Sequence, residues 1–383
     1  MGGWFHPMKG TPVKLIRHAR LAAVALVGAL ALTACGSDEN AEPSTDASGG
    51  ADTACATGTL NGEGSSAQKN AIEEAIASFS DKCSGAKVNY NPTGSGAGIK
   101  QFNAGQVDFA GSDSALKTEP KDGVVEADAA KKRCGGNPAW DLPMVAGPIA
   151  VSYNLPGVSG LTLTPEVAAK LFSGGIKTWN DPAIAAINSG VQLPATPVKV
   201  FYRSDESGTT ENFLKYLAGS APTAWAQEPA KVWPGKAGEG REKSAGVAEG
   251  VKSTPGGLTY VEWSYARDNQ LGIAKIDNGG GAVELNGDSA GKALTAASPA
   301  GEGNDLKLKL DYATKTPGVY PIVLVTYEIV CSKGLDASKT TLLKSFLTHL
   351  SSSETQSSLE EIGYAPVPSE VLSKVSTAIT AIS

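Results

Sequence analysis

Three short turns rich in glycine and serine are the part of this sequence best suited to binding chemistry. Each turn places glycine with serine or threonine between a predicted strand and a predicted helix. They are Gly62–Ala67, Thr93–Gly98 and Arg203–Thr210. A helix N-terminus exposes unpaired backbone N–H groups and the positive end of the helix dipole. Because glycine lets a ligand approach that backbone closely, three such termini at one point predict an anion site.

Two charged residues strengthen the prediction of an anion site. Arg203 ends a β-rich run and enters the third turn, where a guanidinium can bind two oxygens of a tetrahedral oxyanion, with Asp205 to orient it. Asp113 follows another strand-like segment. Each residue taken singly has a simpler interpretation, as a surface Arg–Asp pair and as a capping or turn aspartate. The first two turns, Gly62–Ala67 and Thr93–Gly98, lack the Lys-Ser or Lys-Thr of a P-loop.

The elements that must position these turns alternate between strands and helices. The predicted strands are Val88–Asn91, Val107–Ala110, Ile149–Tyr153, Val198–Tyr202, Leu258–Glu262 and Ile322–Val330. Helical spacing covers Ala67–Phe79, a segment from Thr209 through Leu217, and a C-terminal segment for which Ser369 is the predicted N-cap. This alternation predicts an α/β fold with largely parallel sheets.

The N-terminal segment has the pattern of an export signal. Four basic residues precede an apolar run over Leu21–Ala34, which is too short for a membrane span of about 20 residues. The run ends in Leu-Thr-Ala-Cys-Gly, which resembles the lipobox of bacterial lipoproteins, so we expect Cys35 to be acylated. An ordinary signal peptide with a nearby cysteine is the alternative. We therefore assign 1–34 as signal peptide and 35–55 as a lipidated flexible tether.

The charge of the exported chain limits the kinds of partner it can bind. The whole chain has 383 residues, which suit about two domains. Without residues 1–34 it carries 29 basic and 39 acidic side chains, a formal charge of −10. This charge argues against a nucleic-acid partner. A bound anion must therefore be held by local geometry and not by the field of the whole protein.

Cysteine and histidine usage argue for disulfides and against metal or triad chemistry. Four cysteines follow Cys35, and an even number in an exported chain predicts two disulfides, in one of three pairings. They are Cys55, Cys83, Cys134 and Cys331. The cysteines lack zinc-site spacing, and His349, expected on a helix surface, is the one histidine after the predicted signal. We expect no metal, no cofactor and no Ser-His-Asp triad.

Together these motifs resemble the phosphate-binding proteins of Pst-type ABC importers. The resemblance runs from about Leu60 to the C-terminus. The matching segments, in chain order, are Asn61–Ala67, Val88–Tyr90, Gly94–Gly96, Ile99–Gln101, Val107–Phe109, Ser112–Asp113, Lys170–Gly174, Thr178–Pro182, Arg203–Thr209 and Gly256–Glu262. It implies a periplasmic-binding-protein fold with two α/β lobes and a ligand cleft between them.

The resemblance also implies the boundaries of the lobes and the pairing of the cysteines. The chain would cross between lobes near Val145 and near Val325. Lobe I would then combine residues 56–145 with 326–383, and lobe II would hold residues 146–325. Cys134 and Cys331 both lie close to the crossings, so we expect disulfides Cys134–Cys331 and Cys55–Cys83.

The phosphate ligands implied by the resemblance come from all three turns and from Asp113. They are Ser66, Ala67, Ser95, Asp113, Arg203, Ser207, Gly208 and Thr209. The serine and threonine residues would donate through hydroxyls, and Ala67 and Gly208 through backbone N–H. Two positions depart from the family pattern. The position of Ala67 is often occupied by an aromatic residue in relatives. Glu206 stands where relatives often have glycine, so its carboxylate must point outward or weaken binding.

The implied function is capture of inorganic phosphate and its delivery to the permease subunits of a phosphate ABC importer. The protein would be a monomer without enzymatic activity, lipid-anchored at the extracytoplasmic face of the cell membrane. Asp113 would accept a hydrogen bond from a proton that phosphate carries and sulfate lacks. A buried acceptor left without a hydrogen bond costs about 1–3 kcal/mol or more.

Other functions compete with this interpretation. A related protein could bind sulfate or molybdate, or sense phosphate. An enzyme is also conceivable, because Ser66-Ala67-Gln68-Lys69 fits the SxxK pattern of penicillin-recognising serine enzymes. However, Ser112–Ser114 lacks the asparagine and Lys315–Pro317 lacks the glycine of the two companion motifs. The enzyme hypothesis predicts covalent labelling of Ser66 by a β-lactam.

Overall fold

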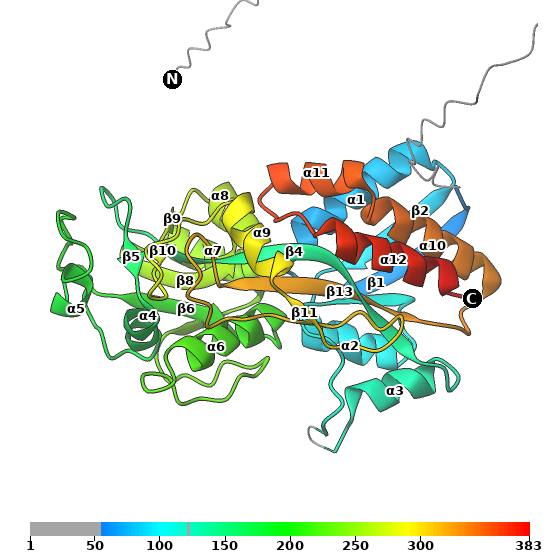
Figure 1. Cartoon of the computed structure of the whole chain (residues 1–383), viewed down its shortest axis with the longest axis horizontal. Coiled ribbons are helices and arrows are strands. Elements are labelled where there is room, and N and C mark those ends of the chain that lie inside the picture. The colour runs from blue at the N-terminus through cyan, green and yellow to red at the C-terminus, as the bar shows by residue number, and fades with distance from the viewer. Residues whose placement is uncertain (1–54, 121–122) are drawn as a thin grey trace, which may run out of the picture. The chain divides into compact units, whose positions relative to one another are not determined.

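The computed structural model describes residues 55–120 and 123–383 and is built on a nine-stranded mixed sheet (Figure 1). The predicted signal peptide, Cys35 and the tether up to residue 54 lie outside the described residues. The strands of the sheet are β1 (Gly58–Gly64), β2 (Ala86–Asn91), β3 (Phe109–Ser112), β4 (Ala139–Tyr153), β6 (Lys199–Arg203), β7 (Glu239–Arg241), β8 (Gly257–Glu262), β9 (Gly272–Ile273) and β13 (Val323–Cys331). Their order is β2-β1-β3-β13-β4-β8-β6-β7, and β9 pairs with β4.

Short strands and helices surround this sheet. Two further pairs are β5 (Thr162–Leu163) with β10 (Lys275–Ile276), and β11 (Ser298–Pro299) with β12 (Leu308–Lys309). The helices are α1 (Lys69–Lys82), α2 (Ser95–Asn103), α3 (Glu126–Arg133), α4 (Pro165–Phe172), α5 (Pro182–Ala185), α6 (Gly208–Ser220), α7 (Lys243–Lys252), α8 (Trp263–Asp268), α9 (Gly287–Thr295), α10 (Ala337–Leu350), α11 (Ser353–Glu361) and α12 (Ser369–Ala381). None of the helices in the described residues combines the length and the apolar character that a membrane span requires.

The sheet is parallel at both ends and antiparallel in the middle, which corrects the expectation of largely parallel sheets. β2, β1 and β3 are parallel, as are β8, β6 and β7. Between them, the long strands β4 and β13 run antiparallel to each other and to their outer neighbours. The chain passes from one end of the sheet to the other in β4 and returns in β13, so these two paired strands run in opposite directions.

The two positions where crossings were predicted are neighbours in the structure. In the β4–β13 register, Val325 pairs with Ala146 and Thr326 pairs with Val145. Both strands extend along the middle of the molecule in Figure 1, with α1, α10 and α12 toward one end and α4, α6 and α8 toward the other. The exact lobe boundaries remain a prediction.

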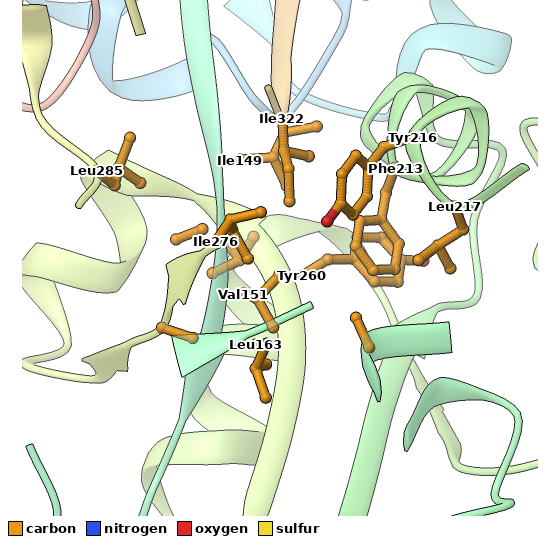
Figure 2. Close-up of a cluster of buried hydrophobic side chains, with 14 of the residues drawn as sticks. Ile149, Val151, Leu163, Phe213, Tyr216, Leu217, Tyr260, Ile276, Leu285 and Ile322 are labelled. Carbon is orange, nitrogen blue, oxygen red and sulfur yellow. The ribbon is translucent and has the colours of Figure 1, made fainter. Parts of the chain in front are cut away.

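Separate hydrophobic cores hold the two ends of the sheet. At one end, the apolar stripe of α1 packs on α10, with the rings of Phe79 and Phe346 edge to face at 5.5 Å between centroids. At the other end, Phe213 of α6 stacks on Tyr260 of β8 at 4.6 Å (Figure 2). Burial of each such ring contributes about 2–3 kcal/mol. The second stack fixes the position of α6 relative to β8.

Two sequence expectations about single residues were wrong. Ser369 is the first residue of α12 and makes no capping bond, because Pro368 occupies the N-cap position. His349 is buried rather than on a helix surface, with its Nε2 at 2.8 Å from Ser78 Oγ. Helix α10 has neighbours on several sides, including α1, α11 and α12, so a helical pattern alone gave no exposed face for His349.

The disulfides pair as the resemblance implied. Cys55 is joined to Cys83, and Cys134 to Cys331. The second bond ties the end of α3 to the end of β13, and both of its cysteines are buried at 2% exposure. It spans 197 residues of sequence, against 28 for the first bond.

The two disulfides should therefore contribute unequally to stability. Closing a longer loop removes more conformational freedom from the unfolded chain, by about 1–2 kcal/mol for these two lengths. We predict that the double variant Cys134→Ala/Cys331→Ala loses more free energy of unfolding in denaturant titrations than the matched Cys55→Ala/Cys83→Ala. Equal losses would contradict the loop-length argument.

Candidate functional site

The predicted turns lie where strands of the sheet end. The first two turns follow β1 and β2, and Asp113 follows β3, so all three share the carboxyl edge of three neighbouring parallel strands. Backbone bonds tie them together, because Gly94 N–H donates to Gly64 O and Ser65 N–H donates to Gly111 O, both at 2.7 Å. The third turn follows β6, at the other end of the sheet.

Asp113 is the buried carboxyl group at the centre of the site. Ser65 Oγ and Thr326 Oγ1 donate to its Oδ1 at 2.5 and 2.8 Å, and Ser95 Oγ donates to Oδ2 at 3.0 Å. Burial, together with the negative charge of Glu262, raises the pKa of Asp113 to about 6, although the three hydroxyls oppose this shift. The carboxyl group can therefore change protonation near neutral pH.

Arg203 supplies a buried positive charge. Its Nε and Nη2 donate to the carboxylate of Asp205 at 2.7 and 2.5 Å, so Asp205 orients one edge of the guanidinium as expected. Burial opposes the charge of Arg203, but the bonds and charge of Asp205 outweigh burial and raise the pKa of Arg203. Nη1 points to Ser244 Oγ at 3.2 Å and Thr209 Oγ1 at 3.4 Å. The edge formed by Nη1 and Nη2 is the edge that can bind an oxyanion.

The N-terminus of α6 reaches the Asp113 side of the site because Gly208 has no side chain. A Cβ at position 208 would lie 2.6 Å from both Ser95 Oγ and Asp113 Cβ, closer than real Cβ atoms approach other atoms. Ser207 caps the helix by accepting from Thr210 N–H at 3.1 Å. The first free N–H groups of α6 thus lie next to Asp113, in the position of an anion-binding helix terminus.

The structure brings the eight predicted ligand residues into one buried region. Ser95, Asp113 and Gly208 are in direct contact. Ser66 reaches Arg203 through Ser244, whose Oγ lies 3.0 Å from Ser66 Oγ. The remaining members, Ala67, Ser207 and Thr209, are also buried.

Five of these residues use their predicted donor or hydroxyl group within the protein, and for Ser66 and Ser95 the partners are the Ser244 hydroxyl and the Asp113 carboxyl group already described. Ala67 N–H donates to Ser65 Oγ at 3.0 Å, and Thr209 Oγ1 donates to Glu262 Oε1 at 2.5 Å. The hydroxyl oxygen of Ser207 accepts the capping bond of α6. Their roles toward a ligand remain predictions.

Sequence reasoning missed several polar residues of this region. They are Ser65, Ser244, Glu262 and Thr326. Ser65 lies inside the first turn, one residue before the predicted ligand Ser66. Ser244 follows Lys243, which adopts a positive φ of 63° without being glycine, so no sequence signal marked that turn. Glu262 and Thr326 lie in buried strands, where the hydrophobic pattern gives no sign of a polar role.

The carboxylate of Glu206 lies against Gly96 of the second turn, where a Cβ would come within 2.4 Å of its Oε2. The effect of Glu206 on ligand affinity remains a prediction. Its carboxylate pairs with Lys100 Nζ at 2.6 Å, and its backbone O accepts from Gly96 N–H at 3.0 Å. The positive charge of Lys100 compensates the carboxylate of Glu206, at the position where the family pattern has glycine. The same contact links α2 at one end of the sheet to the third turn at the other.

A cavity of about 620 Å³ lies next to Asp113, with Lys117 and Lys215 among its lining residues. Both lysines pair with Glu211 of α6, at 3.3 and 3.2 Å. Burial opposes ionisation of Glu211, but the lysine charges lower its pKa to about 2. Within the described part of the chain, no group of His, Cys, Asp and Glu side chains is arranged to hold a metal ion.

Comparisons with known proteins point to one family. The family model for the PBP superfamily domain matches residues 49–354. Phosphate-binding protein PstS 3 of Mycobacterium tuberculosis is 44% identical over 378 residues, covering 97% of this chain and 100% of the relative. PstS 3 of Mycobacterium leprae is also 44% identical, and PstS 2 of Mycobacterium tuberculosis is 41% identical, both with the same coverage.

Solved structures share the fold at lower sequence identity. A high affinity periplasmic phosphate-binding protein bound with phosphate at pH 8.5 is 20% identical, with a TM-score of 0.67 over 84% of this chain and 93% of the other. A phosphate-binding protein from Stenotrophomonas maltophilia is 19% identical, with a TM-score of 0.60 and the same coverage. The periplasmic-binding-protein fold expected from the sequence is thereby confirmed.

The environment of Asp113 predicts a specific pH dependence of stability. Its pKa rises from an ordinary value of 3.8 to about 6 on folding, so its contribution to stability is full below about pH 4 and is lost as the pH rises to about 6. Asp113→Asn removes this titration. In anion-free protein, the wild type should lose roughly 3 kcal/mol of unfolding free energy relative to the variant as the pH rises from about 4 to about 6. If the difference in unfolding free energy between the two proteins did not change with pH, the raised pKa of Asp113 would be contradicted.

Proposed function

Because this chain belongs to the PstS family of phosphate-binding proteins, we propose that it captures inorganic phosphate and delivers it to an ABC importer in the membrane. The observation that carries this proposal is the meeting of Asp113, Arg203 and the N-terminus of α6 in one buried region. The high identity to PstS relatives over 97% of the chain supports phosphate as the ligand.

Phosphate would be held by one positive charge and a ring of neutral donors. The Nη1 and Nη2 edge of Arg203 would bind two oxygens, as its other edge is already paired with Asp205. The α6 N-terminus would add the N–H groups of Gly208 and Thr209. The proposed ligands remain the eight of the sequence prediction, Ser66, Ala67, Ser95, Asp113, Arg203, Ser207, Gly208 and Thr209. Such neutral donors explain how a protein with a negative net charge can hold an anion.

Asp113 would provide selectivity for phosphate over sulfate. Its carboxylate already accepts three hydroxyl bonds, and a protonated phosphate can give it a further one. Sulfate has no proton to donate at neutral pH, so its oxygen would face the carboxylate without a hydrogen bond. The buried repulsion would disfavour sulfate and other deprotonated oxyanions.

Ligand binding would join two lobes of the protein. We propose residues 56–145 with 326–383 as lobe I and 146–325 as lobe II, with β4 and β13 as the connections. Contacts such as Ser114 Oγ to Glu211 at 3.0 Å and Gly96 N–H to Glu206 O already link the two parts. A bound anion would add bonds to both lobes and favour the closed form that the importer recognises.

The place of action follows from the N-terminal segment. We propose that residues 1–34 are removed on export and that Cys35 carries the lipid that anchors the protein at the extracytoplasmic face of the cell membrane. Residues up to 55 would then serve as a tether, so that a monomer can reach the permease subunits. Mass spectrometry of the purified N-terminus tests this part, and an unmodified Cys35 would contradict it.

Replacement of Arg203 tests its proposed role in binding two phosphate oxygens. Arg203→Lys keeps the charge but loses the planar fork, and we expect phosphate affinity to fall about 100-fold or more, because disrupting a buried charge pair costs about 2–5 kcal/mol. Arg241→Ala removes an exposed arginine of the neighbouring strand β7 and is the matched control. Isothermal titration calorimetry measures both. Unchanged affinity of folded Arg203→Lys would show that Arg203 is structural.

Replacement of Asp113 tests its proposed role in selectivity. Asp113→Asn replaces an obligatory acceptor with a group that can also donate, so sulfate would no longer face a buried charge. We expect the ratio of phosphate to sulfate affinity to narrow by about tenfold or more, which corresponds to about 1.4 kcal/mol. Competition titrations of the two anions measure this ratio. An unchanged ratio would remove Asp113 from the recognition of the phosphate proton.

A further inference from the structure

Glu211 is a buried carboxylate of α6 that joins the two proposed lobes beside the ligand position without being one of the predicted ligands. Its Oε2 accepts from Ser114 Oγ at 3.0 Å. Its Oε1 pairs with Lys117 Nζ at 3.3 Å and with Lys215 Nζ at 3.2 Å. Lys215 lies one turn further along the same helix, whereas Ser114 and Lys117 follow β3 in the other proposed lobe. Glu211 therefore pairs with one cation from each proposed lobe.

The neighbouring residue Asn212 holds the same segment of the opposite lobe. Its Nδ2 donates to Asp113 O at 2.7 Å and to Gly208 O at 2.9 Å. Glu211 and Asn212 thus hold two consecutive residues after β3 against the first turn of α6, whose N-terminus is proposed to bind phosphate. If α6 is to move away from Asp113, these hydrogen bonds must break together with the ion pair that Glu211 makes to the opposite lobe.

A second ion pair crosses between the proposed lobes with its charges reversed, since here the cation belongs to lobe II and the carboxylate to lobe I. Buried Lys231 donates from Nζ to Glu126 Oε1 of α3 at 2.9 Å. The other carboxylate oxygen of Glu126 accepts from Lys117 N–H at 3.1 Å. Lys231 O accepts from the N–H of Ser207, the N-cap of α6, at 2.8 Å. The two ion pairs are therefore connected through Lys117, and separation of the lobes would break both.

The two lysine pairs of Glu211 resemble each other in geometry but differ in what lobe opening would do to them. The side chain of Glu211 is 4% exposed, and those of Lys117 and Lys215 are 32% and 38% exposed. Opening of the lobes would take Lys117 away from Glu211 and leave Lys215 in place. A buried charge interacts more strongly with its partner than an exposed charge and is screened less by salt, so loss of the Lys117 pair would oppose opening.

We propose that Glu211 is a positioning residue that slows the release of phosphate, because its ion pair with Lys117 holds the two lobes closed over the bound anion. It acts without touching the phosphate, by keeping the N-terminus of α6 against Asp113. An ion pair that only stabilised the fold would lower the free energy of unfolding when removed but leave the release rate unchanged. This inference rests on the proposed phosphate function and on the proposed lobes.

The variants Lys117→Gln and Lys215→Gln separate this role from ordinary stabilisation. Each removes one lysine charge from Glu211 at nearly equal distance and exposure, and both lysines line the cavity next to Asp113. Only Lys117→Gln removes an ion pair between the proposed lobes. The measurement is the rate at which the preloaded protein releases radiolabelled inorganic phosphate during a chase with excess unlabelled phosphate.

We expect Lys117→Gln to release phosphate about tenfold faster than the wild type, which corresponds to about 1.4 kcal/mol. Release from Lys215→Gln, the matched control, should be less than about twofold faster, because its pair with Glu211 does not oppose lobe opening. In a Glu211→Gln background, Lys117→Gln should have no further effect on the release rate, because the ion pair is already absent. This double-mutant cycle isolates the interaction between the two side chains.

The outcomes distinguish the inference from the function on which it rests. Equal release rates of the two lysine variants, or an unchanged rate in Lys117→Gln, would overturn the role of Glu211 and leave phosphate binding intact. An effect of Lys117→Gln that persists in the Glu211→Gln background would also overturn it, because Lys117 would then act without Glu211. Absence of phosphate binding by the wild type would instead overturn the proposed function, and the inference with it. If Glu211→Gln does not fold, the comparison of the two lysine variants decides.

Discussion

The close approach of the α6 N-terminus to Asp113 is the contact on which the rest of the site depends. Gly208 permits it, because any Cβ there would overlap Ser95 and Asp113. The approach places the positive end of a helix dipole and its free N–H groups beside a buried carboxyl group. In the proposed function, this pairing would hold an anion that also donates a hydrogen bond and would disfavour an anion that cannot.

The scaffold serves to maintain this contact between parts of the chain that are distant in sequence. β4 and β13 lie side by side through the middle of the sheet and link its two parallel ends. The stack of Phe213 on Tyr260 fixes α6, and Tyr260 Oη is also within 2.7 Å of Thr210 Oγ1 and accepts from Arg203 N–H at 3.2 Å. The hydrophobic core thus connects directly to the groups that would bind the ligand.

The sequence predicted those features that depend on local chemistry. Glycine turns mark helix N-termini, and Arg203 ends a strand-like run and enters one of these turns. Asp113 taken singly is a capping or turn aspartate, and only the family resemblance made it a predicted ligand. Ser244 and Thr326 could not be predicted, because they reach the site only through the packing of α7 and β13. The burial of His349 and the antiparallel centre of the sheet are likewise results of tertiary packing that periodicity does not encode.

Calorimetric titration of the wild-type protein, freed of bound anion, with phosphate and then with sulfate tests the proposed site most directly. If Arg203 and Asp113 bind the anion as proposed, phosphate binds tightly and sulfate at least about a hundredfold more weakly, a difference of roughly 2.7 kcal/mol. Equal binding of both anions, or no binding of phosphate, would contradict the proposed site. In that case the family relationship would establish the fold, and the ligand of this chain would have to be a different one.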